Sequence, residues 1–146
     1  MTTAFIAPLA PSGSARALLA SCGLPHDDLE TAPDLALFGY TIGDALAGVV
    51  GLELRGDAAL LRSLAVGPDF RKLWLGIALM AHAERQADAR DVRDLYLLTT
   101  TAAGFFDKLG YRRIPRDEAP EPIRTTGQFS RLCPASAVLM HKRIAD

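Results

Sequence analysis

Three strand-like runs follow one another between residues 34 and 66, and their spacing constrains the fold more than any other feature of the sequence. The runs are LALFGYTI, LAGVVGLEL and ALLRSLAV, and they are separated by GDA and RGDA. Glycine and aspartate accept the backbone angles of tight two-residue turns, so these separators favour hairpin connections between antiparallel strands. The segment therefore predicts two consecutive antiparallel hairpins.

Further helices and strands are predicted on both sides of these hairpins. The segments are AFIAPLA (an edge strand), ARALLASC (a helix capped by Ser12 or Ser14), FRKLWLGIALMAHAERQADAR (a long helix), DLYLLTT (a buried strand), TAAGFFDKLG (a helix closed by Gly110) and SAVLMHKRI (a last strand). Residues 115–134 are rich in proline and charge, with one helical turn or more in EPIRTTGQFSRL. The order predicts an α/β (α+β) fold with a mixed, mostly antiparallel central sheet flanked by helices, in a single domain over residues 1–146.

The charge balance argues against two classes of partner. Sixteen Lys and Arg residues oppose seventeen Asp and Glu residues, which gives a net charge of -1. Such a chain has no overall positive field to attract nucleic acid or an anionic membrane. The N-terminus has no basic start followed by a long apolar run, and no apolar stretch reaches the roughly 18–20 residues that span a bilayer. We therefore expect a cytoplasmic protein without nucleic-acid or membrane partners.

The cysteines and histidines give no metal-binding spacing. Cys22 and Cys133 are too few for a disulfide framework, and the three histidines, His26, His82 and His141, are scattered along the chain. Cys133 is either a covalent nucleophile or a small buried residue, and the second interpretation is favoured because no histidine stands in a recognisable relation to it. No metal is expected.

The junction between a strand and a helix in ALLRSLAVGPDFRKLWLGIAL, residues 59–79, has two interpretations. In the first, Gly67, Pro68 and Asp69 form an ordinary turn before a helix that begins near Phe70 or Arg71. In the second, the unpaired backbone amides of the first helical turn, with Arg71 and Lys72 nearby, bind a phosphate group. Proline cannot donate to a sheet ladder, so the strand can also separate from its neighbour at this point.

This junction and the order of elements resemble the Gcn5-related N-acetyltransferase (GNAT) superfamily over nearly the whole chain. Members carry an Arg-x-x-Gly-x-Gly/Ala loop that holds the pyrophosphate of acetyl-coenzyme A. Arg71 and Gly76 match this loop, whereas Trp74 stands at the middle glycine. A second signature aligns TTAAGFFDKLGY with Asn-x-x-Ala-x-x-Phe-Tyr-x-x-Leu-Gly-Phe/Tyr, with Thr99 at the asparagine and Phe106 at the tyrosine. The resemblance implies a sheet that is splayed at the cofactor cleft.

The resemblance also implies which residues bind the cofactor. They are Leu64, Ala65, Val66, Arg71, Lys72, Leu73, Trp74, Leu75, Gly76, Thr99, Phe105 and Phe106. In this superfamily a backbone N–H of the strand before the loop meets the thioester carbonyl, here around residues 64–66. The departing thiolate usually meets a tyrosine hydroxyl, which Phe106 lacks. Thr99, Thr101, Tyr111 or water then supplies that proton.

The remaining candidates concern the acceptor amine. Glu53 is the nearest carboxylate that can draw a proton from the amine, or else a solvated strand residue. Arg62 has two interpretations. It is either a strand residue that is exposed or pairs with Asp57 or Glu53, or it points with Leu60 and Leu64 to one face and binds an anionic group of the acceptor.

A closer resemblance is to the arsenic-resistance N-acetyltransferase family, which is linked to arsinothricin-like toxic amino acids. RSLAV, LYLLTTTAA, IR.T.QF..LCPASA and a final M.KR carry it, and QFSRLCPASA is the most specific part. Arg124 and Gln128, at i and i+4 in a helix, are candidate acceptor-binding residues. The partners expected are acetyl-coenzyme A as co-substrate and a small amine, with a homodimer left open. The alternatives are a degenerate member that binds acyl-coenzyme A without catalysis and an enzyme that acetylates a protein terminus or lysine.

Overall fold

A seven-stranded sheet forms the centre of the molecule in the computed structural model, which describes residues 4–145. The strand order is β1-β2-β3-β4-β5-β7-β6, and all neighbours are antiparallel except β4 and β5, which are parallel. The strands are β1 (Ala4–Pro8), β2 (Leu35–Ile42), β3 (Ala45–Arg55), β4 (Ala58–Val66), β5 (Asp94–Thr99), β6 (Arg112–Ile114) and β7 (Val138–Arg143). The predicted mixed, mostly antiparallel sheet is confirmed, with β1 at one edge as expected.

The two hairpins β2–β3 and β3–β4 are confirmed at the predicted turns. Gly43 and Gly56 adopt φ angles of 59° and 69°, in the left-handed region that residues with a Cβ enter only at a cost. Each glycine sits at the bend between two paired strands, so the GDA and RGDA separators act as the sequence indicates.

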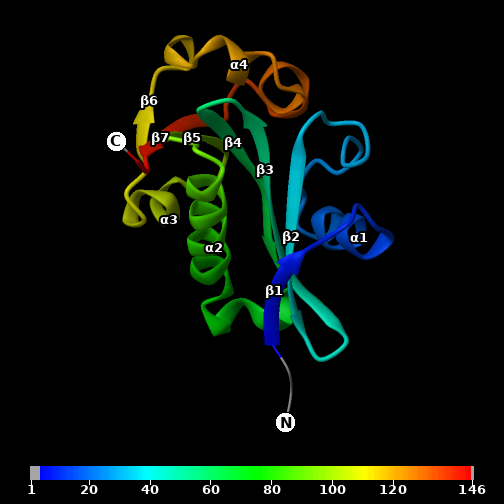
Figure 1. Ribbon diagram of the computed structural model, residues 1–146. Coiled ribbons are helices and arrows are strands. Elements are labelled where there is room, and N and C mark those ends of the chain that lie inside the picture. Colours follow the sequence, from blue (N-terminus) through cyan, green and yellow to red (C-terminus); the bar gives the residue numbers. More distant parts are fainter. Residues whose placement is uncertain (1–3, 146) are drawn as a thin grey trace.

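Helices cover both faces of the sheet (Figure 1). The helix α1 (Gly13–Ser21) packs Leu18 and Leu19 with Val49 and Ala65 on one face. Ser12 caps this helix, because its hydroxyl accepts the Ala15 N–H at 3.2 Å. The helix α2 (Leu75–Ala89) packs on the opposite face, where its residues Leu79, Met80, Ala83 and Ala87 meet the side chains of β3, β4, β5 and β7.

The segment between β5 and β7 contains short elements that the sequence only partly predicts. They are α3 (Ala103–Lys108), a 3-10 turn (Arg116–Glu118), α4 (Glu121–Arg124) and a π-helical turn, η3 (Gln128–Leu132). The strand β6 was not predicted, since its three residues follow the helix-closing Gly110 without a strand-like pattern. α4 places Ile123 against Leu60 and Leu139, which closes the end of the sheet beside β4.

The strands β4 and β5 separate soon after they pair, as the resemblance implied. Their parallel register runs only from Ala58 opposite Asp94 to Leu60 opposite Tyr96. Beyond these residues the two strands have no pairing, so a gap opens between residues 61–66 and 97–99 in the middle of the sheet.

Candidate active site

A cleft of about 530 Å³ fills the gap between the separated ends of β4 and β5. Leu64, Ala65 and Val66 line it from β4, and Leu97, Leu98 and Thr99 line it from β5. The loop after α1 and the π-helical turn η3 contribute further walls through His26, Gln128 and Cys133. The cleft is thus built by segments that are distant in the sequence.

A β-bulge in β4 shapes the wall of this cleft. Arg62 lies opposite Gly51, and Ala65 opposite Val49, so Ser63 and Leu64 together oppose Val50 alone. Ser63 takes a φ angle of 60°, which marks the extra residue. The bulge reverses the alternation of side chains, and Leu64 consequently packs with the α2 face rather than with Arg62. The prediction that Arg62 and Leu64 share a face was therefore wrong.

The helix after β4 begins later than the sequence indicates. A 3-10 turn, η1 (Pro68–Leu73), follows the strand, and α2 begins at Leu75 rather than near Phe70 or Arg71. Trp74 separates the two with a φ angle of 60° and serves as the N-cap residue of α2. The first turn of α2 thus presents the amides of Leu75, Gly76 and Ile77, which have no acceptor inside the helix.

Gly76 leaves room that a side chain would fill. A Cβ at this position would lie 3.3 Å from the Phe105 ring, a tight contact that the ring would have to move to relieve. Arg71 turns back toward the strand, and its Nε donates to the Val66 carbonyl at 3.2 Å. The side chains of Lys72 and Leu73, which were also predicted to bind the cofactor, lie outside the described part of the structure.

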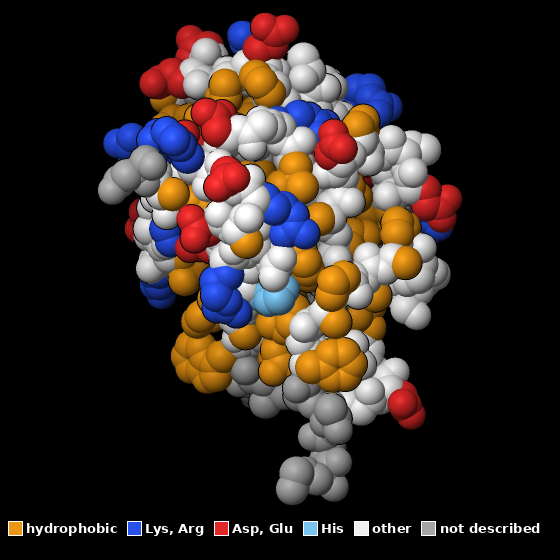
Figure 2. Space-filling view, viewed as in Figure 1, with side chains coloured by type: hydrophobic (Ala, Val, Ile, Leu, Met, Phe, Trp, Pro, Cys, Tyr) orange, Lys and Arg blue, Asp and Glu red, His pale blue; other side chains and the backbone are white. Residues whose placement is uncertain are grey.

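A second hollow of about 600 Å³ continues from the cleft to the start of α2. It shares Leu64, Val66, Arg71 and Phe105 with the cleft and extends to Trp74 and Gly76. Trp74 is 75% exposed, so the large side chain lies at the rim and does not fill the hollow. Figure 2 shows hydrophobic side chains gathered at the end of the molecule that is lowest in the view, over the beginning of α2 and the strand β1.

The start of α3 forms the floor between the two hollows. The Thr99 hydroxyl accepts the Ala102 N–H at 3.0 Å and so fixes the turn into the helix. Phe105 and Phe106 follow, with ring centroids 5.1 Å apart, and both line the cleft. At the two hollows the structure brings together the predicted residues of β4 and β5, the two phenylalanines, and Arg71, Trp74 and Gly76 of the loop before α2. Leu75 is buried and lines neither hollow.

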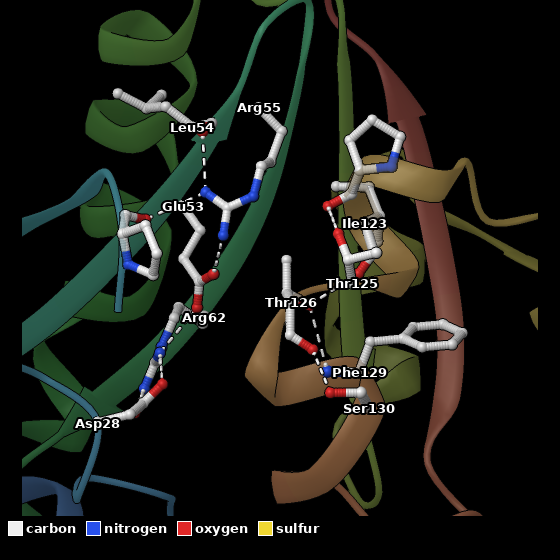
Figure 3. Close-up of polar contacts among 12 residues, drawn as sticks. Asp28, Glu53, Leu54, Arg55, Arg62, Ile123, Thr125, Thr126, Phe129 and Ser130 are labelled. Atoms are coloured by element: carbon white, nitrogen blue, oxygen red, sulfur yellow. Dashed lines mark hydrogen bonds and ion pairs between the residues drawn. The ribbon is translucent and has the colours of Figure 1, made fainter. Parts of the chain in front are cut away.

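Arg62 is the centre of a buried ionic cluster (Figure 3). Its Nη1 donates to Asp28 Oδ2 at 2.5 Å and to Glu53 Oε1 at 2.8 Å, while Nη2 donates to Asp28 Oδ1 at 2.6 Å. Nε donates to the Ser63 hydroxyl at 3.0 Å. These bonds use four of the five N–H groups of the guanidinium.

Burial and ion pairing set the charge states in this cluster. Burial alone would raise the pKa of the Asp28 carboxyl, but the hydrogen bonds and charge of Arg62 outweigh it and hold that pKa below its ordinary value of 3.8. Burial likewise opposes the charge on Arg62, and its bonds to Asp28 and Glu53 nevertheless raise its pKa. Both groups are therefore charged at neutral pH.

The cluster changes the interpretation of two predicted residues. The side chains of Arg62 and Glu53 are each only 1% exposed, and Glu53 also pairs with Arg55 at 3.1 Å. Glu53 does not line the cleft, so the structure gives no support to it as a proton acceptor for the amine. Arg62 pairs with Glu53, as one of its two interpretations held, and additionally with Asp28, so its guanidinium is not a free fork for an anionic substrate.

Tyr111 lies away from the cleft that it was expected to serve. Its ring is buried in the α2-facing core, and its hydroxyl donates to Glu84 Oε2 at 3.0 Å. Burial, followed by the negative charge of Glu84, raises the pKa of the phenol far above its ordinary value of 10.0. Tyr111 does not line the cleft, so the structure gives no support to it as the acid for a thiolate.

We expect the substitution Tyr111→Phe to leave the pH dependence of any acetyl-transfer rate unchanged. It removes one hydrogen bond to a charged acceptor, which should lower the free energy of unfolding by about 1.5–3 kcal/mol. Rates measured across the alkaline range for both proteins provide the check. A high-pH fall in rate that is present in the wild type and lost in the variant would instead make Tyr111 the acid.

The two acceptor-binding candidates near the C-terminus have different positions. Arg124 is exposed on α4 and does not line the cleft. Gln128 belongs to the separate turn η3, so the expected i, i+4 relation in one helix is not formed. Gln128 is 6% exposed and lines the cleft, where its Oε1 accepts the Cys133 thiol proton at 3.2 Å.

Three residues at or near the two hollows were missed by the sequence analysis. His26 lines the cleft from the loop after α1. Asp28, in the same loop, is the main partner of Arg62. Lys108 lines the second hollow. No local pattern marks these residues, because only the chain topology brings the loop and α3 to the cleft.

Two structural absences hold for residues 4–145. No helix there has the length and apolar character needed to cross a membrane. Within the same range, no three His, Cys, Asp or Glu side chains gather where they could hold a metal ion.

Comparison with known proteins identifies relatives of this architecture. Residues 33–113, more than half of the chain, match the family described as "Acetyltransferase (GNAT) domain". An uncharacterized N-acetyltransferase of Chlorobaculum tepidum is 35% identical over 65 residues, which are 44% of this chain and 41% of the relative. The chain therefore matches less than half the length of that protein.

Solved structures agree in fold at low identity. An acetyltransferase of Streptococcus agalactiae has a TM-score of 0.78 at 16% identity, over 96% of this chain and 98% of that one. N-acetylglutamate synthase of Neisseria gonorrhoeae, complexed with coenzyme A and N-acetyl-glutamate, has a TM-score of 0.75 at 22% identity. That match covers 97% of this chain and 36% of the synthase chain.

Proposed function

Because the chain belongs to the GNAT acetyltransferase domain family, we propose that it transfers an acetyl group from acetyl-coenzyme A to the amine of a small molecule. The observation that carries the proposal is the cleft between the separated strands β4 and β5, which continues into the hollow at the start of α2. One ligand can thus reach from a basic hollow at the helix into the middle of the sheet.

The second hollow fits the phosphate groups of coenzyme A. Its charged lining residues, among those described, are Arg71 and Lys108, and both are basic. The first-turn amides of α2 and the missing side chain at Gly76 allow close approach of an anion. A structure of the Neisseria synthase named above contains coenzyme A, which is consistent with this assignment. Arg71, Leu75 and Gly76 are therefore the residues that we assign to the pyrophosphate.

The cleft residues have distinct tasks in the proposed reaction. Acetyl-coenzyme A supplies an activated thioester carbonyl. A backbone N–H among residues 64–66 that points to the unpaired side of β4 polarises that carbonyl. The Thr99 hydroxyl accepts a hydrogen bond from Ala102, so its own proton is available to the departing sulfur. Phe105 and Phe106 exclude water from one wall.

A finer proposal concerns the acceptor. The resemblance of residues 128–137 to arsenic-resistance N-acetyltransferases suggests an amino-acid-like toxin such as arsinothricin. The relatives described above carry no such name, so this acceptor rests on the sequence resemblance alone. Arg62, which in one interpretation binds an anionic group of such an acceptor, is paired with Asp28 and Glu53 and adds no support.

A second candidate is a non-catalytic protein that binds acyl-coenzyme A. Trp74 at the middle glycine of the loop and Phe106 without a hydroxyl favour this alternative. Thiol release from acetyl-coenzyme A, followed with a panel of small amines, separates the two. We expect amine-dependent release, with N-acetylated product detected by mass spectrometry. Binding of coenzyme A without amine-dependent release would support the non-catalytic alternative and exclude the proposed enzyme.

A further inference from the structure

An unpaired polar group in a buried side chain marks the part of the cleft that lies beyond the predicted thioester. Gln128 is 6% exposed, and its Nε2 has no hydrogen-bond partner among the described residues. Gln128 lines the cleft together with His26, whose side chain is 34% exposed and whose Nδ1 lies 3.5 Å from Asp27 Oδ1. Buried polar groups are normally paired, so the unpaired Gln128 amide at this cavity indicates a polar ligand.

Gln128 is the more strongly fixed of the two. Thr126 anchors the turn η3: its hydroxyl donates to the Ile123 carbonyl at 2.7 Å and accepts the Phe129 N–H at 3.3 Å. The Ser130 hydroxyl donates to the Thr126 carbonyl at 2.9 Å (Figure 3). The backbone of this turn is thus held in place before any ligand is bound.

Cys133 fixes the orientation of the Gln128 side chain. The Cys133 N–H donates to the Gln128 backbone carbonyl at 2.9 Å, and the thiol donates to Oε1 at 3.2 Å. Burial raises the pKa of this thiol, so the thiol keeps the proton that it donates. This bond holds Oε1 toward Cys133 and leaves the Nε2 N–H groups, which have no partner among the described residues, to donate to a ligand.

The Gln128 amide, rather than a net charge, selects the ligand. Asp28 and Glu53 neutralise Arg62 and Arg55, so the ionic cluster adds no net charge beside the cleft. Asp27 also lines the cleft, and it lies 3.5 Å from His26 Nδ1. An N–H donor in this setting matches a carboxylate or a carboxamide oxygen.

We propose that Gln128 binds the acceptor through a carbonyl-type oxygen, so that the substrates are small amines that also carry a carboxylate or carboxamide. The inference rests on the proposed acetyl transfer for its substrate role, but the binding contact can be measured without turnover. Gln128 is then a specificity-determining residue of the acceptor subsite.

Matched acceptors test the contact directly. β-Alanine, β-alaninamide and propylamine have the same three-carbon skeleton and carry a carboxylate, a carboxamide and neither group, respectively. Alanine, alaninamide and isopropylamine form a second set of the same kind. The probe is the side-chain amide signal of Gln128 in ¹⁵N-labelled protein with coenzyme A, assigned by its loss in Gln128→Leu. We expect this signal to shift with the oxygen-bearing compounds and not with the two alkylamines. Equal shifts with all compounds, or none with any, would overturn the inference.

Kinetics of thiol release supply the second readout. The oxygen-bearing amines should have a kcat/KM at least about tenfold above their alkyl counterparts, a difference of roughly 1.4 kcal/mol. Gln128→Leu should reduce this preference to within about twofold and leave the KM for acetyl-coenzyme A unchanged. If Gln128→Leu does not fold, Gln128→Met replaces it in this test, because methionine has a shape similar to that of glutamine and lacks the amide.

The matched control is Gln86→Leu on α2. Gln86 does not line the cleft, and its Oε1 accepts a hydrogen bond from Arg90 at 2.7 Å. This variant should retain the full preference. A preference that persists in Gln128→Leu contradicts the inference while leaving acetyl transfer intact. A shifted Gln128 signal without thiol release supports the inference and contradicts the proposed enzyme.

Discussion

Replacement of Arg62 by alanine is expected to lower the free energy of unfolding by about 3–5 kcal/mol at neutral pH. The substitution removes the buried cation that holds Asp28 and Glu53, and it leaves two carboxylates without their main partner. Urea unfolding of both proteins measures the difference. Arg62→Lys keeps the charge but loses the two-pronged bond to Asp28, so it should fall between wild type and Arg62→Ala.

The loss should depend on pH in a defined direction. The pKa of Asp28 is depressed in the folded state, so its ion pair stabilises the protein above the ordinary pKa of 3.8 and ceases to do so as the pH falls through the folded value. In Arg62→Ala the buried carboxylates become protonated more easily. The difference in the free energy of unfolding between the wild type and Arg62→Ala should therefore decrease as the pH is lowered.

Arg16→Ala provides the control for a lost ion pair at the surface. Arg16 pairs with Glu30 at 2.9 Å, with side-chain exposures of 34% and 61%. Such a pair contributes about 0–1 kcal/mol. If Arg62→Ala destabilises the protein no more than Arg16→Ala does, the ionic cluster contributes little to the free energy of unfolding. Binding of the acceptor would then be the better interpretation of Arg62.

The substitution Gly76→Glu is expected to weaken coenzyme A binding at least about tenfold, which corresponds to roughly 1.4 kcal/mol. The new side chain adds bulk against the Phe105 ring and a negative charge beside the first-turn amides of α2. Calorimetric titration with coenzyme A measures the change.

Gly104→Glu is the matched control for this effect. Gly104 lies on α3, is exposed, and has no atom within 4 Å of an added Cβ. It lines neither hollow, so the same side chain at this position should leave the affinity unchanged. Unchanged affinity for coenzyme A in a folded Gly76→Glu protein would contradict the assignment of the pyrophosphate to the start of α2.

The features that were predictable from the sequence are those determined by neighbouring residues. The turns at Gly43 and Gly56 follow from local chemistry, and the alternation of apolar residues then gives the hairpins. Ser12 caps α1 through a bond that spans three residues. The separation of β4 and β5 was expected from the resemblance to a known superfamily and from Pro68, but the pairing already ends at Leu60, well before that proline.

The features that were not predictable depend on contacts between distant residues. Asp28 and Arg62 are 34 positions apart, so the sequence does not show that the arginine is neutralised. The left-handed Trp74 delays the start of α2, although tryptophan carries no signal for such a conformation. Likewise, the hydroxyl of Tyr111 could be placed away from the cleft only after its bond to Glu84 was known.

A crystal structure of the chain with acetyl-coenzyme A tests the proposed site most directly. We expect the pantetheine arm between residues 64–66 of β4 and 97–99 of β5, with the pyrophosphate at the amides of Leu75 and Gly76. The thioester should then face the part of the cleft that contains Gln128 and His26. Coenzyme A bound elsewhere on the protein, or a cleft that remains empty at saturating ligand, would contradict this assignment.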